Sequence, residues 1–284
     1  MKKFVFVALL LITHHSSLIP LHAQRHPGTN FLGVTMGGGL QSWNYTLEQG
    51  ERTAGIGYTL GLHMAYFFDP QFGINFGMRW AWTHSSATYN FSETTEGLVH
   101  PDNPGVTYDL TTTFDHWKER QSVNVVSFPV ELLWRTRINR QQFFYAGLGF
   151  QLDLPIRGSY TIEEGSYTTS GYFPATGHTV VGQPQHGFAN GEEGQEGPVK
   201  ALNLGVSLIA DLGVRWNLGG KGVYLGLYAS YTLNDMVSGT DRPLLELNTD
   251  NSSGIHYNGT FGSREVGSVS LLCVGLKVGV DLGD

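Results

Sequence analysis

Apolar and polar side chains alternate along residues 201–216, which read "ALNLGVSLIADLGVRW". Because successive side chains of a β-strand point to opposite faces, the even-numbered positions form one face and the odd-numbered positions the other. The even face consists of Leu, Val, Ala and Trp, whereas the odd face carries Asn, Gly, Ser, one Ile, Asp211 and Arg215. The pattern predicts a strand with one hydrocarbon face and one small or polar face.

The same alternation recurs along the rest of the chain and predicts eight strands. Short links follow the second, fourth and sixth strands, and much longer segments follow the third, fifth and seventh. The predicted strands cover residues 31–45, 55–68, 72–92, 121–137, 142–157, 200–217, 222–234 and 266–282.

If these strands run up and down, every short turn lies at one end and every long loop at the other. The long loops are then residues 85–120, 158–199 and 235–265, approximately. An even strand count with short turns at one end and long loops at the other is typical of outer-membrane proteins. The sequence therefore predicts an all-β, up-and-down antiparallel transmembrane β-barrel of eight strands. Ten strands remain an alternative if a hairpin in the first or second loop enters the membrane.

A soluble, lipocalin-like barrel is the competing interpretation, since it also has eight strands. Its solvent-facing side would be rich in Lys, Glu and Thr, whereas the second face here is Gly, Ser, Asn and a few charges. Aromatic residues also collect near both ends of the predicted strands, as they do where rings meet the two membrane interfaces. These features favour the membrane barrel.

The first residues, "MKKFVFVALLLITHHSSLIPLHAQ", combine two lysines, a short apolar run and a Leu-x-Ala site. This is the pattern of a secretory signal peptide, so we expect residues 1–23 to be removed and residues 24–284 to form the barrel domain. Without the two lysines, 15 of the 17 basic residues remain against 24 acidic residues, a net charge of −9. That balance disfavours nucleic acid as a partner. A single cysteine, Cys273, excludes an intramolecular disulfide.

Four acidic and four basic side chains fall on the inward parity of the predicted strands. Eight strands enclose a lumen just wide enough for side chains to fill it. Opposite charges in such a space are expected to pair, because an unpaired buried charge is costly. We therefore predict a closed lumen with a balanced charge network made of Arg79, Glu131, Arg135, Asp153, Asp211, Arg215, Lys277 and Asp281.

The segment "SFPVELLWRTRINRQQFFYAGLGFQLDL", residues 127–154, joins an apolar strand with proline to an aromatic-Ala-Gly-Leu-Gly strand through a basic tight turn. This hairpin resembles that of the Bacteroidetes outer-membrane β-barrel family, the PorT-like or OmpA-like barrel domains. The resemblance implies an integral protein of the outer membrane of a Gram-negative bacterium, with loops outside and termini in the periplasm. Because some members of that family assist type IX secretion, it also makes an accessory role in a type IX-like secretion system an alternative function.

One enzyme-like feature is "WTHSS", where His84 and Ser86 share the outward face of the third predicted strand. A histidine beside a serine can act as its base, as a His-x-Ser pair does in barrel enzymes that deacylate lipid A. No acid that would orient His84 is evident, and Glu93 is only a candidate. A lipid A deacylase-like hydrolase is therefore a minor alternative.

Our leading hypothesis is a non-catalytic outer-membrane barrel with no cofactor and no metal. Its partners would be outer-membrane lipid and lipopolysaccharide, and other envelope or secretion-system proteins that contact the loops. The loop of residues 158–199 contains five glutamates and neither Lys nor Arg, and loops of this length are usually functional or disordered. A narrow porin is a further alternative.

Overall fold

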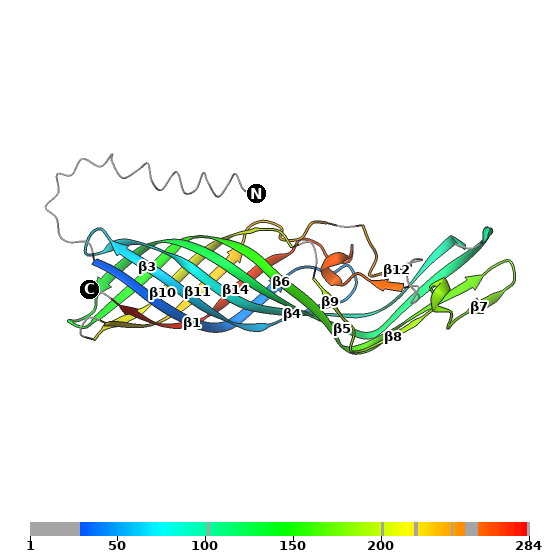
Figure 1. Ribbon diagram of the computed structural model, residues 1–284, viewed down its shortest axis with the longest axis horizontal. Coiled ribbons are helices and arrows are strands. Elements are labelled where there is room, and N and C mark those ends of the chain that lie inside the picture. The colour runs from blue at the N-terminus through cyan, green and yellow to red at the C-terminus, as the bar shows by residue number, and fades with distance from the viewer. Residues whose placement is uncertain are drawn as a thin grey trace, which may run out of the picture.

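Eight long antiparallel strands close into a ring in the computed structural model (Figure 1). Each ring strand pairs with both of its neighbours, and the ring closes where β14 pairs with β1 and β10 with β6. In chain order the ring strands are β1 (Thr29–Asn44), β3 (Ile56–Phe67), β4 (Phe72–His100), β5 (Asn103–Arg137), β6 (Gln142–Phe173), β10 (Gly205–Asn217), β11 (Lys221–Thr232) and β14 (Ser270–Leu282). The structure describes residues 29–100, 103–199, 202–218, 221–239, 241–247 and 255–282.

The fold class predicted from the sequence, an up-and-down barrel of eight strands, is confirmed. The ten-strand alternative is wrong, because the extra hairpins prolong β4, β5 and β6 beyond the ring and do not enter it. Much of the predicted loops at residues 85–120 and 158–199 is therefore strand. The predicted signal peptide, residues 1–23, lies outside the described residues.

The short turns form because asparagine and aspartate cap them. Between β3 and β4, the carboxylate of Asp69 accepts hydrogen bonds from the backbone N–H groups of Gln71 and Phe72, both at 2.6 Å. Between β5 and β6, Asn139 does the same for the backbone N–H groups of Gln141 and Gln142, at 2.9 Å. Such side-chain contacts stabilise tight turns by replacing a backbone hydrogen bond. Because the strands run alternately up and down, all short turns lie at the end of the barrel where β1 begins and β14 ends (Figure 1).

The outside of the ring is apolar and the inside is polar or small. On β14, for example, Leu276 is 59% exposed, while Asp281 on the other face is 4% exposed. Along β11 the exposed and buried positions alternate without a break from Lys221 to Thr232. This arrangement is the reverse of a soluble barrel, in which the apolar face fills the interior. The exposed side chains together form an apolar belt around the ring.

Beyond this belt, β4, β5 and β6 continue as one twisted sheet (Figure 1). We call its far part the extension: residues 90–100 of β4, 103–116 of β5 and 164–173 of β6, with two short strands that pair with β6. These are β7 (His178–Val180) and β8 (Asn190–Glu192).

A β-bulge separates the extension from the barrel. His116 has a φ of 48°, the one positive value of a non-glycine residue among the described residues. The β5–β6 pairing shifts between Asp115 and Lys118, and the β4–β5 pairing shifts between Tyr89 and Phe91. A bulge bends a strand and changes which face its side chains point to. The sheet accordingly changes direction where these shifts occur (Figure 1).

The remaining elements are short. Strand β2 (Glu51–Ala54) pairs with β4, and β9 (Glu196–Pro198) pairs with β6. Strands β12 (Leu245–Leu247) and β13 (Ile255–Tyr257) form a small separate hairpin, and η1 (Pro184–His186) and η2 (Thr260–Gly262) are single 3₁₀ turns. In the described part of the chain, no helix has the length and apolar character needed to cross a membrane.

An aromatic core fills the barrel mouth away from the short turns. The described parts of the segment between β11 and β14, residues 233–239, 241–247 and 255–269, fold into this mouth, and we call them the plug. From the plug, Phe261 packs edge-on against Trp43 and Tyr45, with ring centroids 5.8 and 5.2 Å away. Tyr257 likewise packs against Trp117 at 5.5 Å. These rings are nearly or fully buried, so the mouth is closed by side chains.

The apolar belt generates a first prediction. Leu276→Arg places a charge on the outer face of β14, and we expect it to lower the free energy of unfolding in lipid vesicles by about 2–4 kcal/mol, because an arginine at mid-membrane depth must be desolvated. Urea titration of the folded protein measures the effect. The control is Thr168→Arg, which lies on an exposed position of the extension. Equal effects of the two substitutions would mean that the belt faces water.

Candidate functional site

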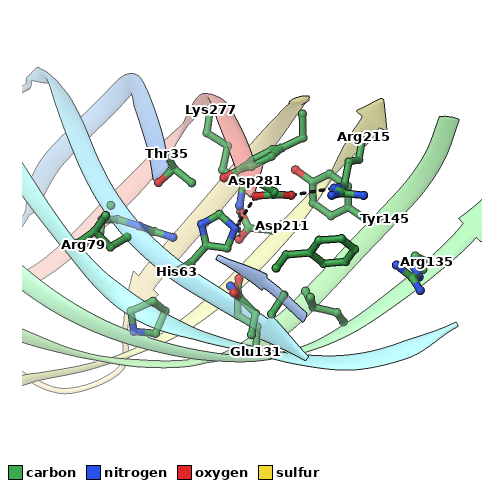
Figure 2. Close-up of a pocket in the computed structure, with 18 of the residues that line it drawn as sticks. Thr35, His63, Arg79, Glu131, Arg135, Tyr145, Asp211, Arg215, Lys277 and Asp281 are labelled. Atoms are coloured by element: carbon green, nitrogen blue, oxygen red, sulfur yellow. Dashed lines mark hydrogen bonds and ion pairs between the residues drawn. The ribbon is translucent and has the colours of Figure 1, made fainter. Parts of the chain in front are cut away.

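A cavity of about 90 Å³ lies inside the half of the barrel nearer the short turns. Seven of the eight charged residues predicted for the lumen line it, and Figure 2 shows them converging from different strands. The eighth, Asp153, is buried in the lumen but does not line the cavity. The seven are Arg79, Glu131, Arg135, Asp211, Arg215, Lys277 and Asp281. That the eight residues form one balanced charge network stays a prediction.

Two ion pairs join β10 to β14 over the inner face of β11, the strand that lies between them. Lys277 Nζ lies 2.6 Å from Asp211 Oδ2, and Arg215 Nε lies 2.8 Å from Asp281 Oδ2. All four side chains are buried, with at most 12% of any of them exposed. The other oxygen of Asp281 contacts His63 Nε2 at 3.0 Å, so this carboxylate sits between an imidazole and a guanidinium (Figure 2).

A glycine makes room for this arrangement. Gly33 on β1 lies directly beside Asp281 and His63, and a Cβ atom there would overlap both side chains. Small residues on β1 therefore leave the space that long charged side chains from other strands fill.

The other charged residues find partners that are not opposite charges. Asp153 accepts hydrogen bonds from Ser127 and Ser207 and from Gln151 Nε2, the last at 2.9 Å. Glu131 accepts one from the amide of Asn75. Buried carboxylates can be satisfied by neutral donors as well as by cations. The network is therefore only partly made of ion pairs.

At the end of the lumen nearest the short turns, arginine side chains stack on phenylalanine rings. The guanidinium of Arg215 lies 3.8 Å from the centre of the Phe31 ring, and that of Arg135 lies 3.8 Å from the centre of Phe67. Phe31 and Phe67 themselves contact edge-on at 5.9 Å. Cation–π contacts of this kind hold a guanidinium in place without a carboxylate. They explain how Arg135 is accommodated, and they narrow this end of the lumen.

The cavity between the plug and the arginine–phenylalanine end of the lumen is lined by several unpaired polar atoms. His63 Nδ1, Asn75 Oδ1 and the Tyr145 hydroxyl are buried and lack a hydrogen-bond partner among the described residues, and all three side chains line the cavity. Its volume and these polar atoms suit a small cluster of water molecules better than a large ligand. Within the described segments, no three His, Cys, Asp or Glu residues are grouped so that they could hold a metal ion.

Glu119 fastens the plug to the barrel wall. Its side chain is fully buried. One carboxylate oxygen accepts hydrogen bonds from the Tyr257 hydroxyl at 2.6 Å and from the Thr260 backbone N–H at 2.8 Å. The other accepts one from Gln121 Nε2 at 2.8 Å. Burial raises the pKa of Glu119 above its ordinary value, although the donors act in the opposite direction.

His84 and Ser86 are not hydrogen-bonded to each other in this structure. His84 Nδ1 is 3.2 Å from the carbonyl oxygen of Ile56, and its Nε2 has no hydrogen-bond partner among the described residues. The ring is buried against Trp82, with centroids 4.1 Å apart. Glu93, the candidate acid, instead pairs with Arg264 at 3.3 Å. A serine without a hydrogen-bonded base lacks the activation that acyl transfer needs.

The sequence pattern missed Glu119 but contained the signal for it. The predicted strand began at residue 121, whereas the odd positions of β5 are buried from Trp117 to Leu133. Continuing the inward parity by two residues would have found Glu119. Tyr145 and Tyr224, which also line the cavity, are aromatic residues on inward positions and were not considered.

The sequence matches no protein-family model and no curated protein sequence. Among solved structures it is similar to Neisserial surface protein A, with 9% identity over 91% of this chain and 99% of that one and a TM-score of 0.38. A major outer membrane protein from Thermus thermophilus shares 11% identity over 90% and 99% of the two chains, with a TM-score of 0.37. Ail, the attachment invasion locus protein of Yersinia pestis, shares 12% identity over 88% and 99%, with a TM-score of 0.28. These values are too low to transfer a function from those proteins to this chain.

The lumen ion pairs lead to a second prediction. Asp211→Asn leaves the Lys277 ammonium buried without its partner, and we expect the free energy of unfolding to fall by about 3–5 kcal/mol. The double variant Asp211→Leu with Lys277→Met should recover most of this loss, because it removes both charges. Denaturant titration followed by tryptophan fluorescence measures both, with the exposed Asp241→Asn as control. A single variant as stable as the parent would show that the pair contributes nothing.

The raised pKa of Glu119 leads to a third prediction. Because the folded plug binds this proton more tightly than the unfolded chain does, its stability is highest below the unfolded pKa and falls as pH rises through the folded value. Hydrogen exchange at the Thr260 amide, corrected for the intrinsic rate, should therefore show more protection at low pH than at high pH. Glu119→Gln should remove this dependence, and the exposed Glu192→Gln should retain it. Protection that increases with pH in the parent protein would contradict the assignment.

Proposed function

We propose that this protein is an integral outer-membrane barrel whose role is to hold the extension outside the cell as a surface for binding other molecules. The barrel serves as the anchor, and the lumen serves neither as a pore nor as an active site. This proposal assigns to the extension the partner-binding role that the sequence predicted for the external loops.

The observation that carries the proposal is the length of three strands. A transmembrane strand needs about 9–11 residues, whereas β4, β5 and β6 contain 29, 35 and 32 residues. At roughly 3.3 Å per residue, β5 is about 115 Å long, several times the roughly 30 Å of the hydrocarbon core. Strands of this length are far longer than crossing the membrane requires.

The extension has internal packing of its own, which supports a role as a rigid platform. Tyr108 stacks on Phe173 with ring centroids 5.6 Å apart and meets Phe188 edge-on at 5.5 Å. Elsewhere in the extension, Thr94 and Thr111 are hydrogen-bonded across the strands at 2.9 Å. Cross-strand pairs of this kind stabilise a sheet. A rigid surface loses less conformational entropy on binding than a mobile loop.

The lumen supports a closed anchor over a porin. The plug and its aromatic core occupy one mouth, and Arg135 and Arg215 stack on phenylalanines at the other. The ion pairs cross the space between them. An eight-stranded barrel has little room beyond its own side chains.

A labelling experiment tests the proposal and constitutes a fourth prediction. Cys273 is buried, so a cysteine introduced at an exposed position is the one that a membrane-impermeant maleimide should reach. We expect Ala175→Cys, at the tip of the extension between β6 and β7, to be labelled on intact cells. Arg140→Cys, in the short turn between β5 and β6, should be labelled only after the outer membrane is permeabilised. Labelling of the turn and not of the tip on intact cells would refute the proposed orientation.

A further inference from the structure

The two edges of the extension differ in whether other strands pair with them. On the β6 side, two short strands cover the edge of the extension, since β7 and β8 pair with residues 171–173 and 166–168, and β9 covers the same edge nearer the barrel at residues 159–161. On the other side, β2 covers β4 only from Ser85 to Thr88. From Phe91 onward, β4 pairs with β5 and with no other strand in the described part of the chain. One edge is capped and the other is open.

The open edge is suitable for accepting another strand. From Phe91 to Thr95 the register with β5 is continuous, and the strand is irregular only beyond Thr95. An open edge presents backbone N–H and C=O groups that can pair with an extended segment. The chain itself uses this edge in that way, because β2 lies on it immediately before the open stretch. An added strand would lie on the same edge of β4 as β2, beyond the bulge between Tyr89 and Phe91.

The charge of the extension indicates what kind of strand would be accepted. Residues 90–116 and 163–199 contain ten aspartates and glutamates and neither Lys nor Arg. On the open edge, Glu96 is exposed, and Glu93 is 41% exposed although it contacts Arg264. A second copy paired through this edge would bring like charges together, which destabilises a sheet. A basic segment would bring opposite charges together.

Apolar side chains lie on the same edge. The Phe91 ring packs on Phe114 at 5.1 Å and is only partly buried, and Val99 is 56% exposed. Because Phe91 and Glu93 are two residues apart, their side chains point to the same face. An incoming strand with an apolar residue and a Lys or Arg two positions apart would match both.

We propose that the open edge of β4 from Phe91 to Thr95 binds an extended polypeptide segment that carries an apolar residue and a Lys or Arg two positions apart, by adding it to the sheet. This inference rests on the proposed function, since it names the partner class of the extension. Backbone pairing provides the attachment, Phe91 and Glu93 select the sequence, and Glu96, just beyond the stretch, adds negative charge.

The test uses the full-length protein in detergent and a fluorescein-labelled nonapeptide, Thr-Lys-Thr-Val-Thr-Lys-Thr-Val-Thr, followed by fluorescence anisotropy. We expect saturable one-to-one binding. The same peptide with Glu in place of Lys should not bind, and neither should a version N-methylated at every internal residue, which lacks the N–H donors for pairing on either of its edges. Equal binding of the N-methylated peptide would overturn the inference, because charge alone would then explain the attraction.

Variants of the protein locate the site. Glu93→Gln with Glu96→Gln should weaken binding about three- to tenfold, since each exposed charge pair contributes modestly. The matched control, Glu192→Gln with Glu193→Gln on the capped side, should bind like the parent. An equal loss in both double variants would overturn the edge assignment.

Proline scanning tests the backbone contribution. Thr94 and Thr95 are adjacent, so one of their N–H groups points to β5 and the other to the open edge. Proline at the edge-facing position removes a donor without breaking the β4–β5 pairing, so at least one of Thr94→Pro and Thr95→Pro should abolish peptide binding while the barrel remains heat-modifiable on a gel. Unchanged binding in both variants would overturn the inference. A peptide-independent dimer that these prolines dissociate would also overturn it, because the edge would then belong to a second copy.

The outcomes separate this inference from the proposed function. If the tip cysteine is labelled on intact cells but the peptide does not bind, only the edge inference fails. If the tip is not labelled, the proposed function fails whatever the peptide does in detergent.

Discussion

Every backbone N–H and C=O group inside a lipid bilayer must find its hydrogen-bond partner within the protein, and the rest of this structure depends on that constraint. It requires the sheet to close, which β14 and β1 accomplish along a continuous register from Leu32–Leu282 to Asn44–Ser270. The constraint no longer applies where the apolar belt ends, because water there can form hydrogen bonds with exposed backbone N–H and C=O groups. The sheet is accordingly a closed ring inside the belt and an open-edged extension outside it. The closed ring and the open-edged extension therefore follow from one rule, applied on either side of the boundary between lipid and water.

Closure with only eight strands determines the chemistry of the interior. The lumen is too narrow for a continuous column of water, so its polar side chains must find hydrogen-bond and ion-pair partners among themselves. The kind of partner differs along the barrel axis. Near the short turns, guanidinium groups lie on phenylalanine rings. In the middle, ion pairs link β10 and β14. At the far mouth, the plug supplies aromatic rings, and Glu119 ties it to β5. The lumen is thereby filled by the side chains of the protein itself, which is consistent with the proposal that binding takes place on the extension.

The barrel was largely predictable from the sequence. A strand with one face toward lipid and one toward the lumen must alternate apolar and polar residues, and this alternation is directly visible in the sequence. All eight ring strands lie at or near their predicted positions, and inward parity found the seven charged residues at the cavity wall. Partner choice was not predictable, because it depends on the register between strands: the pattern cannot reveal that Asp153 would meet Ser127 and Ser207. The extension was assigned to loops because the bulge at His116 shifts the alternation and because threonines and glycines replace the apolar positions.

The pairing of β1 with β14 joins residues as far apart as Leu32 and Leu282, nearly the full length of the described chain. Contacts of such high sequence separation form late, because they close the longest loops. By contrast, β4, β5 and β6 pair with their neighbours in the chain through ordinary hairpins. The topology therefore lets the extension and its side of the barrel pair while the β1–β14 seam is still open, and closing that seam carries the largest loop-closure cost of the ring.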